Sequence, residues 1–255
     1  MKIFVCVKHV PDSAINIAVK DNCSIDENIG FILNPYDENA VTEAVRLRDN
    51  HPGSEVVAVC LGKESAMEAV RSALAMGADR GILIVSDKIN DCMTTANALS
   101  AAIEQDAAPD IILLGKESID AVGMQTMYRI AACMDLPVVN NITRIEVAAG
   151  KAVVDTMSPD GGTDTYEMAL PCVVGAGKNL NDPEYPTFRQ VMTSKKKPVK
   201  TIQLNELNLP LSKAGVEVVA LEPFSRERKS EALTGSLDDM AKQIIHILED
   251  EVKVL

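Results

Sequence analysis

Four short apolar runs alternate with helix-like segments in the first half of the chain, and this alternation limits the possible folds more than any other feature. The runs cover residues 2–7, 56–61, 81–85 and 111–114. They lack the polar and apolar alternation of a strand with one wet face, as expected for strands that helices cover on both sides. Strands that alternate with helices imply right-handed crossovers. The sequence therefore predicts an α/β fold with a parallel sheet.

The second half of the chain has a different pattern. Apolar residues on both sides of 148–151 predict a hairpin, residues 159–162 a turn, and residues 165–176 a further strand. Residues 177–200 are polar and carry a lysine run, which predicts either a mobile loop or an arm that a partner orders. Ser236 has the position of a cap before a last amphipathic helix. We expect this C-terminal third to wrap another molecule, such as a second subunit.

Charge and cysteine usage exclude several classes of partner and site. The chain has 25 basic and 37 acidic residues and a net charge of -12, which disfavours nucleic acid and anionic membranes as partners. Six cysteines without a C-x-x-C pair are typical of thiols in a reducing compartment. Three well-separated histidines give no reason to expect a metal site. With no signal-peptide or membrane-span pattern, we expect a cytoplasmic protein.

The loop after the fourth apolar run is the first candidate for a binding site. The run ends at Gly115, a polar segment follows, and a helix-like pattern starts at Gly123. Ligands of open α/β sheets bind beyond the carboxyl ends of the strands, where a glycine lets backbone approach a ligand closely. An ordinary strand-to-helix turn explains the same local pattern, so both interpretations stand at this point.

No catalytic constellation emerges from the sequence. It contains no G-x-S-x-G elbow, no P-loop and no G-x-G-x-x-G fingerprint after the first apolar run. Asp160 and Asp164 could act as paired carboxylates, but a turn beside two glycines explains Asp160 without chemistry. His9 follows a buried strand, where a structural hydrogen-bonding role is more common than that of a base. We therefore expect the structural role for His9.

A series of short motifs, taken in order and with its spacing, resembles the small or beta subunit of electron-transfer flavoprotein over almost the whole chain. The motifs are Val5-Cys6-Val7-Lys8, Val10-Pro11-Asp12, Asn34-Pro35-Tyr36-Asp37, Ala73-Leu74-Ala75-Met76-Gly77-Ala78-Asp79, Leu114-Gly115-Lys116, Ile119-Asp120, Gln125-Thr126, Asp160-Gly161-Gly162, Leu170-Pro171, Asn181-x-Pro183-x-Tyr185 and the lysine run. One such motif would be weak evidence, but the ordered set makes the resemblance strong.

The resemblance implies a heterodimer with an alpha subunit that carries a redox-active FAD. It implies the nucleotide-binding fold of the adenine nucleotide alpha hydrolases for residues 1–176. Residues 177–255 would form a partner-recognition loop and a C-terminal arm whose final helix wraps the alpha subunit. The pair would shuttle electrons between a donor, such as NADH or a dehydrogenase, and an acyl-CoA dehydrogenase-type flavoenzyme. The beta subunit would perform no bond-making chemistry alone, because the redox chemistry belongs to the flavin.

The resemblance also implies a set of site residues, carried over by motif position. The pocket would hold either a structural AMP or, in electron-bifurcating members, a second FAD, and phosphate would meet the start of the helix after Gly123. The expected cofactor-binding residues are Cys6, Asn34, Pro35, Tyr36, Asp37, Leu61, Gly115, Lys116, Ser118, Asp120, Gly123, Met124, Gln125 and Thr126. The expected residues for docking of the dehydrogenase are Tyr185, Phe188 and Met192.

Some positions depart from the family pattern and leave the occupant of the pocket open. Residues 120–126 lack the second aspartate and the first threonine that bifurcating members usually show, which argues against a second FAD. Residues 10–12 and 34–37 nevertheless resemble that bifurcating group. A rival interpretation from another class is a nucleotide-dependent hydrolase or stress-type sensor of the same fold. The polar arm and the last helix argue against that rival.

Overall fold

The computed structural model describes residues 1–88, 90–209, 215–216, 218–223, 230, 232–251 and 253–254. The chain divides into two compact units, residues 1–221 and 222–255. Parts of the predicted C-terminal arm, such as residues 210–214 and 224–229, lie outside the described residues.

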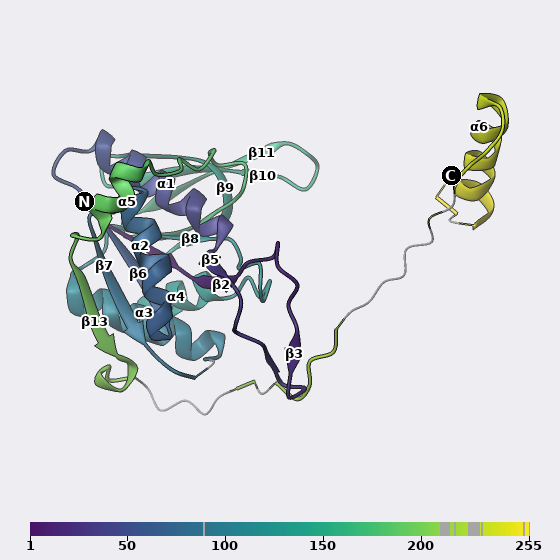
Figure 1. Cartoon of the computed structure of the whole chain (residues 1–255). Helices are drawn as coiled ribbons and strands as arrows, with labels where there is room; N and C mark the ends of the chain where they lie inside the picture. Colours follow the sequence, from purple (N-terminus) through teal and green to yellow (C-terminus); the bar gives the residue numbers. More distant parts are fainter. Residues whose placement is uncertain are drawn as a thin grey trace. The chain divides into compact units, whose positions relative to one another are not determined.

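The first unit is built on one large sheet, which the described residues form with nine strands in the order β11-β10-β9-β12-β8-β1-β6-β7-β13 (Figure 1). From β9 to β13 in this order all neighbours are parallel, whereas β10 pairs antiparallel with both β9 and β11. The strands are β1 (Lys2–Val7), β6 (Glu55–Gly62), β7 (Arg80–Val85), β8 (Ile111–Gly115), β9 (Val138–Ala148), β10 (Lys151–Met157), β11 (Thr163–Ala169), β12 (Cys172–Ala176) and β13 (Val199–Gln203). The predicted α/β class with a parallel sheet is confirmed.

Helices cover both faces of the parallel strands, which explains the continuous apolar runs. Alternate residues of β1 point to opposite faces. Ile3 and Val5 pack in the core with α1 (Pro35–Asn50) and α2 (Met67–Ala75), which follows the short turn η1 (Glu64–Ala66). Phe4 and Cys6 pack on the other side with α3 (Cys92–Asp106) and α4 (Thr126–Met134). Every residue of β1 after Lys2 therefore belongs to one of the two apolar cores.

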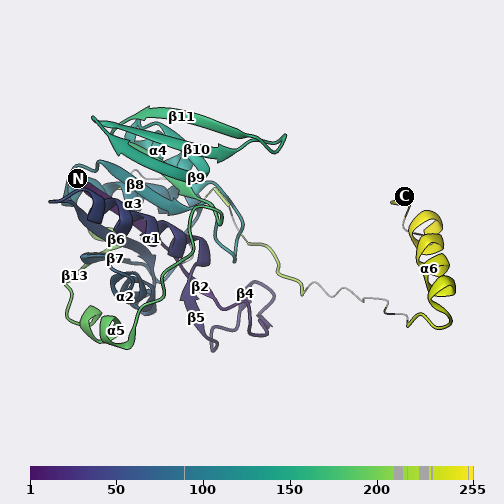
Figure 2. The ribbon, with the colours of Figure 1, turned by 90° about the horizontal axis from the view of Figure 1, so that it is seen from above.

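The antiparallel strands β9, β10 and β11 form one edge of the unit, as the view from above shows (Figure 2). Strands β9 and β10 meet at Ala149 and Gly150, as the sequence predicts for this hairpin. The predicted single strand over 165–176 is wrong, because the chain leaves β11 after Ala169 and enters β12 at Cys172, three places away in the sheet order. Pro171 lies at this break and has no backbone N–H with which to continue the ladder.

Among the described residues, two small antiparallel pairs of strands lie outside the main sheet. Strand β2 (His9–Pro11) pairs antiparallel with β5 (Phe31–Leu33), and β3 (Val19–Lys20) pairs with β4 (Ser24–Ile25). The first pair brings the segment after β1 against the segment before α1. The polar stretch between Asp12 and Gly30 therefore forms a long loop whose two ends lie side by side.

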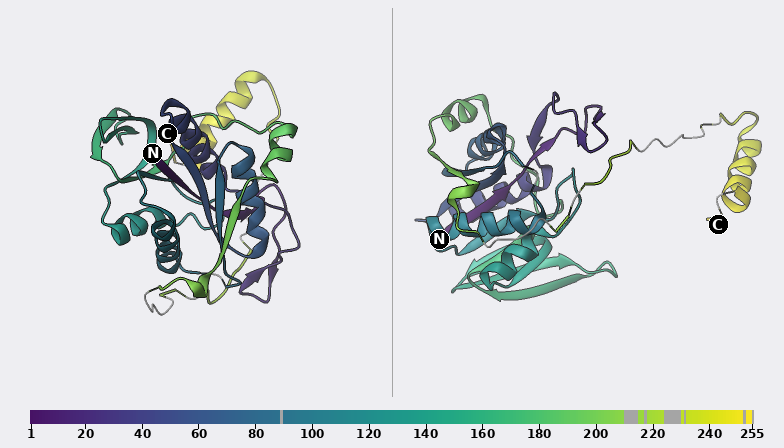
Figure 3. Two further views of the ribbon diagram at one scale, coloured as in Figure 1. Left: turned by 90° about the vertical axis from the view of Figure 1, so that its left-hand side faces the viewer. Right: turned by 90° about the horizontal axis from the view of Figure 1, so that it is seen from below.

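Helix α5 (Phe188–Ser194) and strand β13 lie within the segment for which the sequence predicts a loop or an arm. Helix α5 packs beside α2 (Figure 3). Arg71 on α2 donates hydrogen bonds of 2.7 Å to the carbonyl oxygens of Ser194 and Lys197. Lys197 Nζ donates in return to the carbonyl oxygens of Leu74 and Ala78, at 2.9 and 2.6 Å. Lys197 thus fixes the segment after α5 to the end of α2. Strand β13 and the short turn η2 (Leu204–Glu206) follow this segment.

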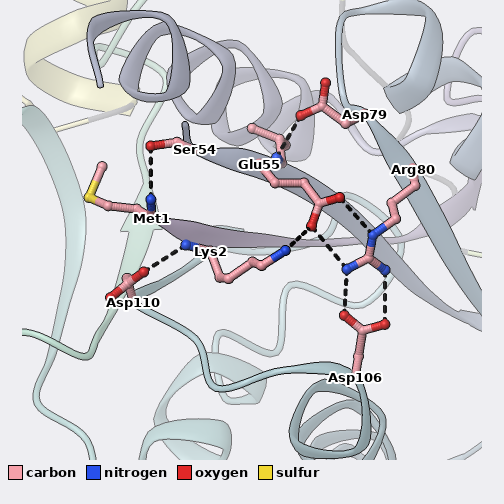
Figure 4. Close-up of polar contacts among 9 residues, drawn as sticks. Met1, Lys2, Ser54, Glu55, Asp79, Arg80, Asp106 and Asp110 are labelled. Carbon is pink, nitrogen blue, oxygen red and sulfur yellow. Dashed lines mark hydrogen bonds and ion pairs between the residues drawn. The ribbon is translucent and has the colours of Figure 1, made fainter. Parts of the chain in front are cut away.

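The amino ends of the parallel strands are joined by a polar network at the edge of the sheet where β1, β6 and β7 begin (Figure 4). Arg80 makes paired hydrogen bonds to Asp106, at 2.9 and 2.6 Å, and to Glu55, at 3.0 and 3.1 Å. Lys2 N donates to Asp110 at 2.6 Å, and Lys2 Nζ donates to Glu55 at 2.5 Å. Because the ligand side of such a sheet is its carboxyl edge, we assign this network to stability.

The second unit contains helix α6 (Leu237–His246), followed by a π-helical turn η3 (Ile247–Glu251). The Ser236 side chain accepts a hydrogen bond from Asp239 N, so the predicted cap is confirmed. Leu237, Ile244 and Ile245 are exposed within this unit. Among the described residues, no helix is long and apolar enough to cross a lipid bilayer.

Candidate functional site

A cavity of about 780 Å³ lies at the carboxyl ends of β1, β6 and β8, where Cys6, Leu61 and Gly115 line it. The chain runs outward from β1 to β6 and β7 and then returns to place β8 on the other side of β1. This reversal is the topological switch point at which open α/β sheets bind their ligands. The volume is in the usual range for small-molecule sites.

Most of the residues that the sequence predicts for the site come together at this cavity. All the predicted cofactor-binding residues except Pro35 and Tyr36 line its wall. Pro35 instead begins α1, and the Tyr36 ring lies beneath Lys116, with Nζ 5.2 Å from the ring centroid. Their role in cofactor binding stays a prediction, as does that of the lining residues.

Asp37 holds three elements together below the cavity floor. Its Oδ2 accepts a hydrogen bond from Lys8 N at 2.7 Å, after β1. Its Oδ1 accepts from Gly115 N, at the end of β8, and from Asn34 Nδ2, before α1, both at 3.0 Å. Asp37 is only 5% exposed, and burial raises the pKa of its carboxyl to about 7 against the opposing effect of these donors. The side chain therefore fixes the start of α1 against the ends of both central strands.

Asn34 extends this arrangement into the loop after β8. Its Nδ2 donates to the carbonyl oxygen of Glu117 at 2.9 Å, and its Oδ1 accepts from Ile119 N at 3.1 Å. Asn34 is 1% exposed and is thus a buried amide with its polar atoms paired. The motif from Asn34 to Asp37 shapes the cavity mainly by positioning the backbone of this loop.

Gly115 is required by a close approach of α1. An added Cβ would lie 2.4 Å from Asp37 Oδ1, 2.6 Å from Tyr36 Cβ and 2.7 Å from the Tyr36 carbonyl carbon. The sequence predicts a close backbone approach at this glycine, but to a ligand. In the structure the atoms that leave no room for a side chain belong to Asp37 and Tyr36, and the approach of a ligand to Gly115 stays a prediction.

The start of α4 faces the cavity without a side-chain cap. The N-cap residue Gln125 makes no capping hydrogen bond, whereas the Asp91 side chain caps the neighbouring helix α3. Before α4, Val122 and Met124 have left-handed φ angles of 50° and 52°. Such conformations are costly outside glycine and concentrate at functional loops. Gln125 and Thr126 line the cavity, so the free amides of this helix start are available to an anion.

Lysines bring positive charge to the cavity, and carboxylates pair with three of them, including Lys116, whose Nζ lies 3.4 Å from Glu117 Oε1. Lys8 Nζ lies 2.7 Å from Asp120 Oδ2, and Lys63 Nζ lies 2.5 Å from Glu27 Oε2. These pairs are partly exposed and contribute little stability. They tie the loop after β8 and the segment before β5 to the ends of the strands.

A second wall of the cavity escapes the sequence analysis. It consists of residues on the β2–β5 pair, before β5 and near the start of α2, including His9, Ile29, Phe31 and Glu68. His9 Nε2 is buried and has no hydrogen-bond partner, so the expected structural hydrogen bond of this nitrogen is not formed. The pairing of β2 with β5 brings His9 and Phe31 together, with their ring centroids 5.0 Å apart. No motif in the sequence signals that pairing.

The three residues predicted for docking of the dehydrogenase lie together on the surface around α5. Tyr185 is 76%, Phe188 81% and Met192 47% exposed in this chain. The Phe188 side chain is therefore not packed against its own domain. Thr187 and Gln190 form a reciprocal capping box that holds the start of α5.

Comparison with known proteins identifies the family. The electron transfer flavoprotein domain matches residues 23–207. The chain belongs to the electron transfer flavoprotein family. The electron transfer flavoprotein subunit beta of Syntrophomonas wolfei is 41% identical over 88% of this chain and 91% of its own.

Two further relatives are also similar to this chain over most or all of its length. The electron transfer flavoprotein subunit beta of Bacillus subtilis is 32% identical over 100% of both chains. The caffeyl-CoA reductase-Etf complex subunit CarD of Acetobacterium woodii is 33% identical over 88% of this chain and 86% of its own. The family resemblance predicted from the motifs is thus confirmed, and electron transfer is the role of this family. Its beta subunits pair with an alpha subunit.

Proposed function

We propose that this chain acts as an electron transfer flavoprotein beta subunit that holds an adenine-containing nucleotide in the switch-point cavity. The observation that carries the proposal is the meeting, in one cavity, of the family motifs with the uncapped start of α4. The nucleotide is either AMP or FAD. Its binding would order the site, and the redox chemistry would be supplied by flavin.

The residues present fit such a nucleotide. One side of the cavity is apolar, with Leu61, Leu99, Leu114 and Met127 available to an adenine ring. The amides at the start of α4 suit a phosphate, because the first N–H groups of a helix are unpaired and its dipole favours negative charge. The protein's contribution is to bind the nucleotide, to exclude water from its ring and to hold the loop backbone in place.

The alpha subunit and a dehydrogenase would engage different parts of this chain. The amphipathic helix α6 presents exposed apolar residues in its own unit and is our candidate for contact with the alpha subunit. The exposed group Tyr185, Phe188 and Met192 is our candidate for docking an acyl-CoA dehydrogenase-type flavoenzyme. Aromatic residues at the centre of a polar rim are the usual anchors of such interfaces. Six free cysteines agree with a cytoplasmic location.

The test is to identify the nucleotides that the co-purified alpha and beta pair releases on denaturation, by chromatography and absorbance. Two FAD per pair would place a flavin in the cavity of this chain and would make electron bifurcation the working mechanism. One FAD and one AMP would identify a simple one-flavin carrier. A pair that releases only the flavin of the alpha subunit, and binds neither AMP nor further FAD, would overturn the proposal.

A further inference from the structure

A buried polar stripe on α1 contacts the segment that carries the candidate docking residues. Asn39, Glu43 and Arg46 follow one another at the spacing of one helix face, and Asn39 and Glu43 are only 4% and 1% exposed. Buried positions of a helix are usually apolar, because a buried polar group needs a hydrogen-bond partner. The main partner of this stripe outside α1 is Asn181, in the segment that follows β12.

Asn181 and Asn39 make reciprocal hydrogen bonds. Asn39 Nδ2 donates to the carbonyl oxygen and to Oδ1 of Asn181, at 2.7 and 3.0 Å. Asn181 Nδ2 donates in return to the carbonyl oxygen of Asn39 at 3.1 Å and to Glu43 Oε2 at 3.2 Å. These four contacts fix the chain to α1 soon after it leaves the sheet.

The contact with Glu43 joins Asn181 to a charged pair. A buried carboxylate is stable only with charged or hydrogen-bonding partners. Arg46 is one of these partners, with Nε at 3.2 and 3.1 Å from the two carboxylate oxygens of Glu43. Arg46 Nη2 also donates to the carbonyl oxygen of Ile145, on β9, at 3.3 Å. The network therefore links the segment after β12 both to α1 and to the sheet.

The segment 182–193 is thus fixed at both ends, to two different helices. Asn181 holds its first end on α1, and Arg71 on α2 holds its last end through two backbone carbonyl oxygens. Tyr185 and Phe188 are 76% and 81% exposed, so their side chains do little to fix the segment themselves. Their place on the surface depends on the two ends and on the packing of α5 against α2.

We propose that Asn181 is a positioning residue for dehydrogenase docking, and that its contacts with α1 hold Tyr185 and Phe188 where the partner meets them. This inference rests on the proposed function, because it takes the surface around α5 as the docking site. Loss of the Asn181 contacts frees the first end of the segment, so that the docking side chains no longer keep one position. The partner then has to fix them itself on binding, which weakens docking and leaves the electron-transfer step unchanged.

The test is Asn181→Asp in the full chain co-purified with its alpha subunit. The substitution keeps the side-chain shape but places a carboxylate oxygen where the Nδ2 donor lay, beside the Glu43 carboxylate. Electron transfer from an acyl-CoA dehydrogenase, reduced by butyryl-CoA, gives KM for the pair and kcat. KM should rise about fivefold, while kcat stays within about twofold. The nucleotide content should not change, and amide hydrogen exchange should accelerate within residues 182–193 but not in the central strands.

Two further variants make the result independent of how well the aspartate variant folds. Asn181→Ala removes the side-chain contacts without adding a charge and should also raise KM. Adding Glu43→Gln to Asn181→Asp exchanges the carboxylate and the amide, so a donor again faces an acceptor and Arg46 keeps a negative charge nearby. This double variant should recover part of the lost affinity, which a general weakening of the fold would not allow.

The matched control for damage to α1 is Arg48→Ala. Arg48 Nη1 donates from the same helix to the carbonyl oxygen of Gly77 at 2.7 Å and to Asp79 at 2.9 Å, and these contacts do not involve the docking segment. Arg48→Ala should therefore lower the unfolding midpoint without changing KM. An Arg48→Ala variant that raises KM as much as Asn181→Asp would show that any loss of stability weakens docking, and would overturn the specific role of Asn181.

Phe188→Ala separates failure of this inference from failure of the proposed docking surface. A raised KM in Phe188→Ala with an unchanged KM in Asn181→Asp and Asn181→Ala would overturn the positioning role and leave docking at α5 intact. A double variant no better than Asn181→Asp would also overturn the role of the contact with Glu43. Equal KM values in the wild type, Asn181→Asp and Phe188→Ala would instead overturn docking at α5, which is part of the proposed function.

Discussion

Replacing Gly115 with alanine should be among the most damaging single-methyl changes in this chain. The new Cβ would meet Asp37 Oδ1 at 2.4 Å and Tyr36 Cβ and carbonyl carbon at 2.6 and 2.7 Å. Real Cβ atoms do not approach other atoms so closely, and two of these neighbours belong to Tyr36 in the first turn of α1. The variant must therefore push α1 away from β8 and stretch the hydrogen bond from Gly115 N to the Asp37 carboxylate.

The expected loss of stability follows from these two effects. Forcing an extra methyl into a packed position costs about 1–3 kcal/mol. Losing a hydrogen bond to a buried charged group costs about 1.5–3 kcal/mol more. Gly115→Ala should thus lower the free energy of unfolding by about 2.5–6 kcal/mol, a large fraction of the total for a typical domain. For a chain of this size the melting temperature should fall by roughly 10 °C.

The assay is urea unfolding followed by circular dichroism, with Gly123→Ala as the matched control. Gly123 lies in the same loop, and an added Cβ there would have no atom within 4 Å. The control should keep the wild-type midpoint or exceed it slightly. The larger change Gly115→Val should also release the bound nucleotide, because the displaced helix α1 carries Asp37, whose hydrogen bonds hold the floor of the cavity in place. A Gly115→Ala variant as stable as Gly123→Ala would refute the reasoning.

Three further predictions test other parts of the structure. Arg80→Ala should cost about 2–3 kcal/mol, because it leaves the Asp106 carboxylate unpaired and Glu55 with Lys2 as its remaining partner. Arg144→Ala should not change the midpoint, and equal effects of the two variants in urea unfolding would contradict this. Burial raises the pKa of Asp37 from 3.8 to about 7, so the folded state binds more protons than the unfolded state between these two pH values. The wild type should therefore lose stability relative to Asp37→Asn as pH rises from about 4 to about 7, and the difference should stay constant at higher pH. A pH-independent difference in unfolding midpoints would rule this out. Phe188→Ala should slow electron transfer to the dehydrogenase partner without loss of nucleotide, whereas the exposed control Tyr166→Ala should leave that rate unchanged. An unchanged rate in Phe188→Ala would show that Phe188 does not anchor the partner.

The sequence predicts the central fold well because burial on two faces leaves a direct mark on composition. The runs at residues 2–7, 56–61, 81–85 and 111–114 have no polar face, and all four are parallel strands of the main sheet. Strand β13 gives no such mark, since only Val199 and Ile202 of its residues are apolar. An edge strand needs fewer buried side chains, so its pattern is too short to predict.

The sequence likewise predicts the parts of the candidate site that are contiguous in the chain, but not those that depend on contacts between distant segments. The loop after β8 is contiguous, so its glycines and polar residues can be read together. The wall of His9 and Phe31 depends on a pairing of two three-residue strands across the intervening long loop. Gly115 is an intermediate case, because the sequence predicts a close approach there without showing that α1 makes it. Distant contacts leave no periodic pattern and require the structure.

The anchoring of α5 has a consequence for the speed of partner exchange. The segment that carries Phe188 starts from β12 and ends in β13, both strands of the central sheet, and Arg71 and Lys197 fasten its far end to α2. A partner that docks here meets a helix that is already formed, so association is not delayed by ordering of backbone and its entropic cost falls mainly on exposed side chains. For the electron carrier that we propose, such a surface would let brief encounters with a dehydrogenase succeed without tight binding.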